Sequence, residues 1–144
     1  MFKQSMIAVA CTFGLAFGAF AAQTTGMSKD QYKAEKDKIE AQYKADKKAC
    51  DGMKGNAKDV CEKEAKGKEK VAKAQLEEQY KPSARHEKEA EEAQAKANYQ
   101  VAKEKCEDLK GKAEHDCKAQ AKAQMHTAKA DTAATGNAAN GTTR

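Results

Sequence analysis

The sequence has no tryptophan, one proline and few aromatic residues of any kind. Aromatic residues make up 6% of the 144 residues, and all four phenylalanines lie among the first twenty. Such a chain cannot fill a deep core, and domains that bury little surface generally need crosslinks or partners. A buried, mostly apolar catalytic pocket is therefore not expected. Beyond residue 21 the larger apolar side chains are Ile39, Val60, Val71, Leu76, Val101, Leu109, Met27, Met53, Met125, Tyr32, Tyr43, Tyr80 and Tyr99.

The chain begins with a segment typical of a secretory signal peptide. Lys3 precedes an uncharged run over residues 6–20, and Ala19 and Ala21 place small residues at the −3 and −1 positions of a cleavage site. These three parts in this order predict export, with cleavage after Ala21 and a periplasmic location. The run is shorter than the roughly 20 residues of a membrane span.

Cys11 allows a competing interpretation of this segment. Residues 7–11 have the form of a degenerate lipoprotein box, which would make Cys11 a lipidated N-terminus. Position 8, however, is Ala where such boxes usually carry Leu, and the apolar core would be unusually short. We therefore expect Cys11 to be removed with the signal peptide.

An internal repeat at an offset of 56 residues organises the rest of the chain. Tyr43, Cys50 and Cys61 correspond to Tyr99, Cys106 and Cys117, and Lys54-Gly55 corresponds to Lys110-Gly111. Two cysteines, a glycine and a tyrosine in fixed register indicate a duplicated unit, each with a Cys-x10-Cys pair.

Strong helix formers, chiefly Ala, Lys, Glu and Gln, predict helix nearly throughout. Ser28 and Gln31 form a capping box before a first helix, and Gly52 and Gly55 interrupt it. Asn56 is expected to cap a second helix, which runs to about Tyr80 before Pro82. Ser83 caps a third helix that ends near Gly111, and a fourth reaches about Asp131.

Charge and apolar spacing agree with these helices. Glu and Lys recur four apart on the outer faces, which supports isolated helices: Glu40–Lys44, Glu62–Lys66, Glu64–Lys68, Glu69–Lys73, Glu77–Lys81, Glu92–Lys96 and Glu114–Lys118. A thin apolar stripe follows the opposite side of each helix. The stripe residues are Ile39, Tyr43, Cys50, Cys61, Ala65, Ala72, Leu76, Tyr99, Ala102, Cys106, Leu109, Ala113, Cys117, Ala121, Met125 and Ala128.

The four cysteines on the stripe are the candidate crosslinks. After export their even number favours disulfides, and the repeat selects Cys50–Cys61 and Cys106–Cys117. Eleven residues of unbroken helix span about 16 Å, whereas disulfide Cα atoms lie about 4.4–6.8 Å apart. Pairing thus requires the chain to reverse at the intervening glycines. The alternative is a continuous helix with both thiols on one face, free or linked to another chain.

The sequence gives little indication of a metal, catalytic or nucleic-acid site. His115 and Asp116 beside Cys106 and Cys117 offer metal ligands, but no Cys-x2-Cys is present and surface histidines are the simpler interpretation. No nucleophile, phosphate-loop or dinucleotide motif occurs. The chain has only two arginines, and acidic residues interrupt its basic runs, which disfavours binding to nucleic acid. Its lysines allow weak contact with an anionic surface.

The segment from Cys50 to Cys61, which contains Gly-Asn-Ala-Lys-Asp-Val-Cys at residues 55–61, resembles a family of small exported proteins of Gram-negative bacteria. These proteins carry such segments amid Ala/Lys/Glu-rich helices and are often labelled TolA-like or cell-envelope proteins. The resemblance extends from about Ser28 to Ala130 and implies a cell-envelope role. The second copy departs from the pattern, with Lys112 in place of Asn.

The sequence therefore predicts an all-α protein of two tandem disulfide-closed helical hairpins. Residues 1–21 are the signal peptide, 22–81 and 82–131 the hairpins, and 132–144 a disordered tail. We expect a non-enzymatic structural or interaction role, without cofactor, metal or small-molecule substrate. The protein would be a helical spacer or a self-associating, coiled-coil-like module whose stripe is completed by an envelope protein or a second copy. The alternative is a periplasmic stress or binding protein that uses Lys, His and Cys on an anionic surface or a metal.

Overall fold

Four long helices account for nearly all of the chain that the computed structural model describes, which is residues 26–139. They are α1 (Lys29–Ala49), α2 (Gly55–Tyr80), α3 (Ala84–Lys105) and α4 (Lys112–Ala139), with a short 3-10 helix, η1 (Cys106–Asp108), between the last two. No strand occurs within these residues. The predicted signal peptide and Cys11 lie outside the described residues.

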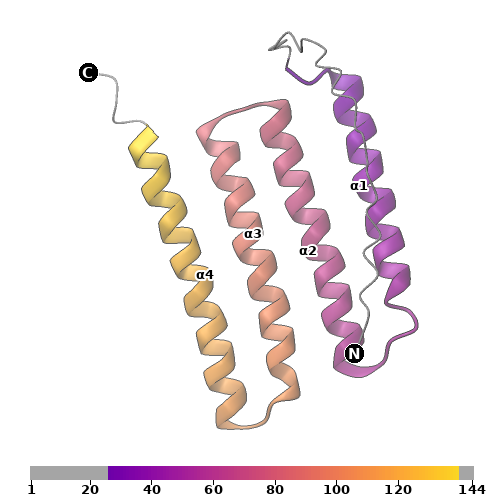
Figure 1. Cartoon of the computed structure of the whole chain (residues 1–144), viewed down its shortest axis with the longest axis vertical. Helices are drawn as coiled ribbons and strands as arrows, with labels where there is room; N and C mark the ends of the chain where they lie inside the picture. Colours follow the sequence, from indigo (N-terminus) through magenta and orange to yellow (C-terminus); the bar gives the residue numbers. More distant parts are fainter. Residues whose placement is uncertain (1–25, 140–144) are drawn as a thin grey trace, which may run out of the picture.

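The helices run alternately up and down and lie side by side in one layer, in chain order (Figure 1). Substantial contacts join only neighbours in sequence: α1 with α2, α2 with α3, and α3 with α4. The hairpin turns of α1–α2 and α3–α4 lie at one end of the layer, and the α2–α3 connection lies at the other (Figure 1). The all-α fold with two disulfide-closed hairpins is thus confirmed, and the two hairpins form an open row.

Local signals set most of the helix boundaries. Ser28 and Gln31 form the predicted capping box at the start of α1. Ser83 accepts a hydrogen bond from the His86 amide at the start of α3, directly after the proline that ends α2. Gly55 and Gly111, which correspond in the repeat, both have positive φ, of 58° and 59°. Glycine adopts this conformation without the Cβ penalty, so both turns can be tight.

Three local predictions were wrong. Asn56 does not cap α2, since the N-cap is Lys54 and makes no side-chain cap bond. The third helix ends at Lys105 rather than near Gly111, because η1 tightens its last turn. The fourth helix continues to Ala139, so residues 132–139 are helical rather than a disordered tail. Their alanines favour helix, and the Thr132 hydroxyl donates to the Ala128 carbonyl instead of breaking it.

The core is thin and lies between the helices. In the described residues its apolar members are Cys50, Ala65, Val71, Leu76, Ala90, Ala95, Cys106 and Ala121. Five of the residues predicted for the stripe belong to this set, whereas Leu109 is 41% exposed in the turn after η1. Gly67 marks the closest approach of α2 and α3, because a Cβ there would lie 3.1 Å from the Ala97 Cβ. Small side chains therefore let the two hairpins meet closely.

No helix within residues 26–139 is both long enough and apolar enough to cross a membrane.

Candidate interaction surfaces

The two disulfides close the hairpins at the same end of the layer. The structure joins Cys50 to Cys61 and Cys106 to Cys117, each with a Cα–Cα distance of 5.7 Å. This is the pairing that the repeat predicts. Cys50 and Cys106 follow α1 and α3 and are 0% and 1% exposed, so the bonds are shielded at the base of each turn. Their thiolates are consequently not available as metal ligands.

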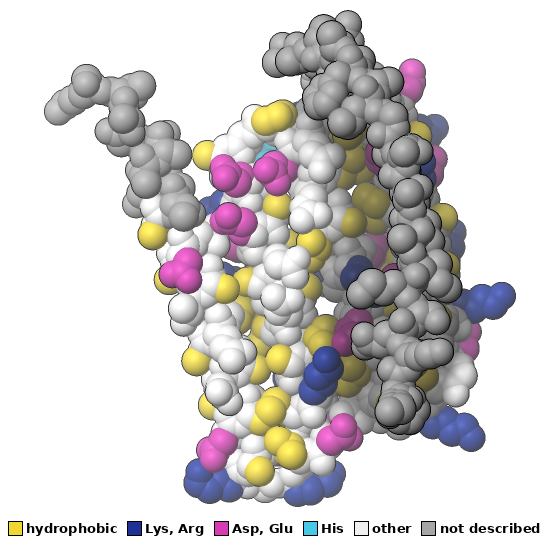
Figure 2. All heavy atoms as spheres, viewed as in Figure 1, with side chains coloured by type: hydrophobic (Ala, Val, Ile, Leu, Met, Phe, Trp, Pro, Cys, Tyr) yellow, Lys and Arg dark blue, Asp and Glu magenta, His cyan; other side chains and the backbone are white. Residues whose placement is uncertain are grey.

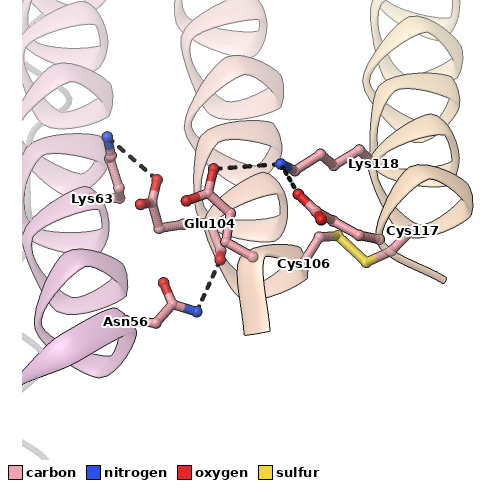
Figure 3. Close-up of polar contacts among 8 residues, drawn as sticks. Asn56, Lys63, Glu104, Cys106, Cys117 and Lys118 are labelled. Carbon is pink, nitrogen blue, oxygen red and sulfur yellow. Dashed lines mark hydrogen bonds and ion pairs between the residues drawn. A yellow bond between two sulfur atoms is a disulfide. The ribbon is translucent and has the colours of Figure 1, made fainter. Parts of the chain in front are cut away.

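The two hairpins are held together by polar contacts beside the disulfides (Figure 3). The Asn56 side chain donates to the backbone carbonyl of Glu104 at 3.0 Å, across from α2 to α3. The Glu104 carboxylate, 13% exposed, lies 3.3 Å from the Lys63 ammonium. On the same pair of helices Lys105 lies 3.2 Å from Glu64. These contacts set the register of one hairpin against the other.

A second set of contacts joins α1 and α2 toward the opposite end of the layer. The Tyr32 ring stacks on the Tyr80 ring with centroids 4.4 Å apart, and its hydroxyl donates to the Glu77 carboxylate. That hydrogen bond, together with burial, raises the pKa of Tyr32. Nearby, the Lys73 ammonium lies 3.5 Å from Glu40 of α1 and 2.7 Å from Glu69 of its own helix.

Acidic residues thus form ion pairs and hydrogen bonds both within a helix and between neighbouring helices. Three of the predicted four-apart pairs are present in the described residues: Glu69–Lys73, Glu92–Lys96 and Glu114–Lys118. Hydrogen bonds from the lysines lower the pKa of Glu92 and of Glu114. The acids of three other predicted pairs, Glu40, Glu64 and Glu77, instead contact a neighbouring helix.

One face of the layer carries mainly amide and small apolar side chains. We call it the amide face: the residues that line three adjoining grooves, one at each helix junction. The α1–α2 and α2–α3 grooves share Ala72 and Gln75, and the α2–α3 and α3–α4 grooves share Asn98, Ala102 and Gln124. The three grooves therefore form one continuous surface. The largest, between α2 and α3, has a volume of about 640 Å³. In Figure 2, which looks onto this face, yellow and white side chains cover the middle of α3 and α4.

Charged residues on the amide face are few and balanced. Those that line its grooves are two acids, Glu35 and Glu64, and two lysines, Lys68 and Lys105. Glu64 and Lys105 pair with each other, and Glu35 pairs with Lys38. The rest of the lining is amide, aliphatic or aromatic: Met27, Gln31, Ile39, Gly67, Val71, Ala72, Gln75, Leu76, Gln79, Gln94, Ala95, Ala97, Asn98, Tyr99, Val101, Ala102, Ala121, Gln124, Met125 and Ala128.

The opposite face of the α2–α3 junction has a different chemistry. A groove of about 380 Å³, which we call the lysine groove, is lined by Lys63, Lys66, Gly67, Lys70, Glu89, Ala93, Lys96, Ala97 and Gln100. Four ammonium groups thus face a single carboxylate, and the Arg85 guanidinium binds that carboxylate at 2.9 Å. Periodicity alone did not reveal the two faces. The sequence feature that distinguishes the two faces is the spacing of glutamines four apart on one side of α2, as in Gln75 and Gln79, while lysines occupy the other side of the same helix.

The residues that were considered and disfavoured as metal ligands do not form a site of three or more such side chains. No group of three or more His, Cys, Asp or Glu side chains suited to a metal ion occurs within residues 26–139. Cys106 and Cys117 are bonded to each other beside His115, and the His86 ring nitrogen Nδ1 contacts the Lys81 carbonyl at 2.6 Å. His86 therefore completes the turn between α2 and α3.

Comparisons of the chain with protein-family models, curated proteins and solved structures gave no match. The two faces of the layer and the disulfide-closed turns are thus the features on which a functional proposal rests.

Proposed function

We propose that this protein is a non-enzymatic structural module of the cell envelope, exported through its N-terminal signal peptide. In this proposal it associates with a second copy through the amide face. The single observation that carries the proposal is the one-layer arrangement, in which few charged residues line the grooves on one face. The resemblance of the Cys50–Cys61 segment to exported envelope proteins agrees with it.

A single layer of helices leaves its apolar side chains half covered. Stable domains usually consist of two or more packed layers around a shared core. In the described residues each helix makes substantial contacts only with its neighbours in the row, so Val101, Ala102 and Met125 remain partly exposed on the amide face. A second layer laid on this face would complete the burial of these side chains.

Charge favours a second copy as that layer. The full chain has a net charge of +5, and +4 remains once Lys3 is removed with the signal peptide, so the surface as a whole mildly repels another copy. The amide face is the exception, because its two acids and two lysines cancel. Two identical faces can meet about a two-fold axis, which closes the assembly at a dimer. Glutamine and asparagine carry both donors and acceptors, so the same amides can pair with themselves across the interface.

Sedimentation equilibrium of the oxidised protein tests this proposal. Wild type should form dimers, and the variant Gln94→Lys/Gln124→Lys should be monomeric, because it places two like charges on each of the facing surfaces. The control is Gln100→Lys, an equally exposed glutamine of α3 on the opposite side of the layer. It should dimerise as wild type does. A monomeric wild type, or equal dissociation of the control, would contradict the proposal.

A further inference from the structure

We infer that the lysine groove is a binding site for phosphorylated ligands that carry two or more negative charges. The inference goes beyond the proposed self-association and does not require it, since the groove lies on the face of α2 and α3 opposite to the amide face.

The groove brings cations from two helices onto a floor of small residues. Lys63, Lys66 and Lys70 are spaced three and four apart, which puts them on one side of α2. Lys96 reaches the same groove from α3. Between them the floor of the groove is formed by two small residues that pack closely together, Gly67 of α2 and Ala97 of α3.

Two of these lysines are held in place and two are free to bind. Lys63 is paired with Glu104 across the helix junction, and Lys96 is paired with Glu92 of its own helix. Lys66 and Lys70, both exposed, make no ion pair or hydrogen bond with another residue of the described range 26–139. Residues four apart on a helix have Cβ atoms about 5–6 Å apart, so both ammonium groups can reach neighbouring phosphoryl groups.

The polar groups around the groove favour an anion over a cation. Its one acid, Glu89, is neutralised by Arg85. The Gln100 side chain adds amide donors on the α3 wall. Lysine is a common phosphate ligand that acts as a point charge with three rotatable donors. A ligand with one charge would engage a single lysine at an exposed site, where ion pairs contribute little. A ligand therefore needs several negative charges on one molecule or surface to bind this groove.

Two sources can present such charges: a soluble polyphosphate, or a cluster of phospholipid headgroups at a membrane surface. Titration calorimetry with tripolyphosphate reports the first. Cosedimentation with phosphatidylglycerol vesicles, compared with phosphatidylcholine vesicles, reports the second. Binding in either experiment supports a phosphate site and identifies its source. Absence of binding in both, at low salt where screening is weakest, overturns the inference.

The decisive variant is Lys66→Gln/Lys70→Gln. Both lysines are exposed and unpaired, so the fold should be unaffected. Binding should weaken about tenfold or more, because two charge-assisted contacts are lost. The control, Lys44→Gln/Lys122→Gln, removes the same charge from exposed lysines of α1 and α4 outside the groove. It should bind within about twofold of wild type. Equal weakening by both variants would show non-specific attraction and overturn the site.

A second comparison uses the two faces of α3. Gln100→Glu adds a carboxylate to the lysine groove, and Gln94→Glu adds the same group to the amide face. Only Gln100→Glu should weaken binding of the phosphorylated ligand. If Gln94→Glu weakens binding as much, the ligand does not occupy the groove and the inference fails.

Discussion

The first hairpin, α1 with α2, and the second, α3 with α4, are near copies at the disulfide end and differ at the other. In both copies the cysteines are eleven apart with a Cα–Cα distance of 5.7 Å. A glycine with positive φ stands at the same place in each turn. The local sequence of the repeat therefore specifies the closed end of each hairpin.

Away from the disulfides the copies have diverged. The first hairpin has the Tyr32–Tyr80 stack and the Tyr32–Glu77 hydrogen bond. The positions 56 residues later than the two tyrosines are Lys88 and Gly136, which carry no ring. The second hairpin packs instead through small or flexible side chains, among them Ala95, Ala121 and Met125. The first hairpin is therefore fastened at two places by specific contacts, and we expect the second to depend more on its disulfide.

Removal of each disulfide should therefore have unequal consequences. Closing a loop of this length stabilises a protein by about 3 kcal/mol in the chain-entropy model. Cys106→Ser/Cys117→Ser should release α4, with loss of helix measured by circular dichroism and fast amide hydrogen exchange along residues 112–139. Cys50→Ser/Cys61→Ser should lower the free energy of unfolding by a similar amount while α1 stays docked. The expected difference would be contradicted if amide hydrogens of α1 in the Cys50→Ser/Cys61→Ser variant exchanged as fast as those of α4 in the Cys106→Ser/Cys117→Ser variant.

The aromatic contact of the first hairpin can be tested by Tyr32→Phe. The ring and its stack remain, but the hydrogen bond to the charged Glu77 is lost. Hydrogen bonds to charged groups contribute about 1.5 kcal/mol, so the urea midpoint should fall with an unchanged slope. Tyr43→Phe is the matched control in α1, because the Tyr43 hydroxyl makes no hydrogen bond with the residues that the structure describes. A loss of the same size in the control would refute the role of Glu77.

The same contact predicts a pH dependence. The hydrogen bond to Glu77 raises the pKa of Tyr32 in the folded protein. As pH rises past about 10, the ordinary tyrosine value, the unfolded chain loses this proton first. The contribution of this hydrogen bond to the free energy of unfolding is therefore fully present below about pH 10 and is lost as pH rises through the pKa of Tyr32 in the folded protein. The difference between wild type and Tyr32→Phe in urea unfolding should shrink over that range. A constant difference would show that Tyr32 and Glu77 are not linked.

Much of the fold was predictable because its signals are local. The Ser28 capping box, the Pro82 break, the Ser83 cap and the cysteine pairing each depend on residues within a few turns of one another. These features are set by backbone donors, ring closure and chain reversal, which act at short range.

The arrangement of the helices was less predictable, since it depends on contacts between distant residues. Glu40 and Glu64 have lysines four residues later, yet they pair with Lys73 and Lys105 of other helices. The low-complexity pattern offers many equivalent pairings, and the close approach at Gly67 together with the polar contacts between α2 and α3 selects the register. The lysine groove is a product of that register, and composition alone indicated no more than a mild positive charge.

The smallest predicted effect concerns Asn56, a residue at the start of α2 that contacts the second hairpin. Asn56 donates to the Glu104 carbonyl across the helix junction, whereas its counterpart Lys112 pairs only with Asp116, four residues along α4. Asn56→Ala should lower the free energy of unfolding by about 0.5 kcal/mol, because the lost hydrogen bond is partly offset by the better helix propensity of alanine. Lys112→Ala should change it by less, since exposed pairs contribute little. If Lys112→Ala costs as much as Asn56→Ala in urea unfolding, Asn56 does not fasten one hairpin to the other. The register then depends on Gly67 and on the Lys63–Glu104 and Lys105–Glu64 pairs.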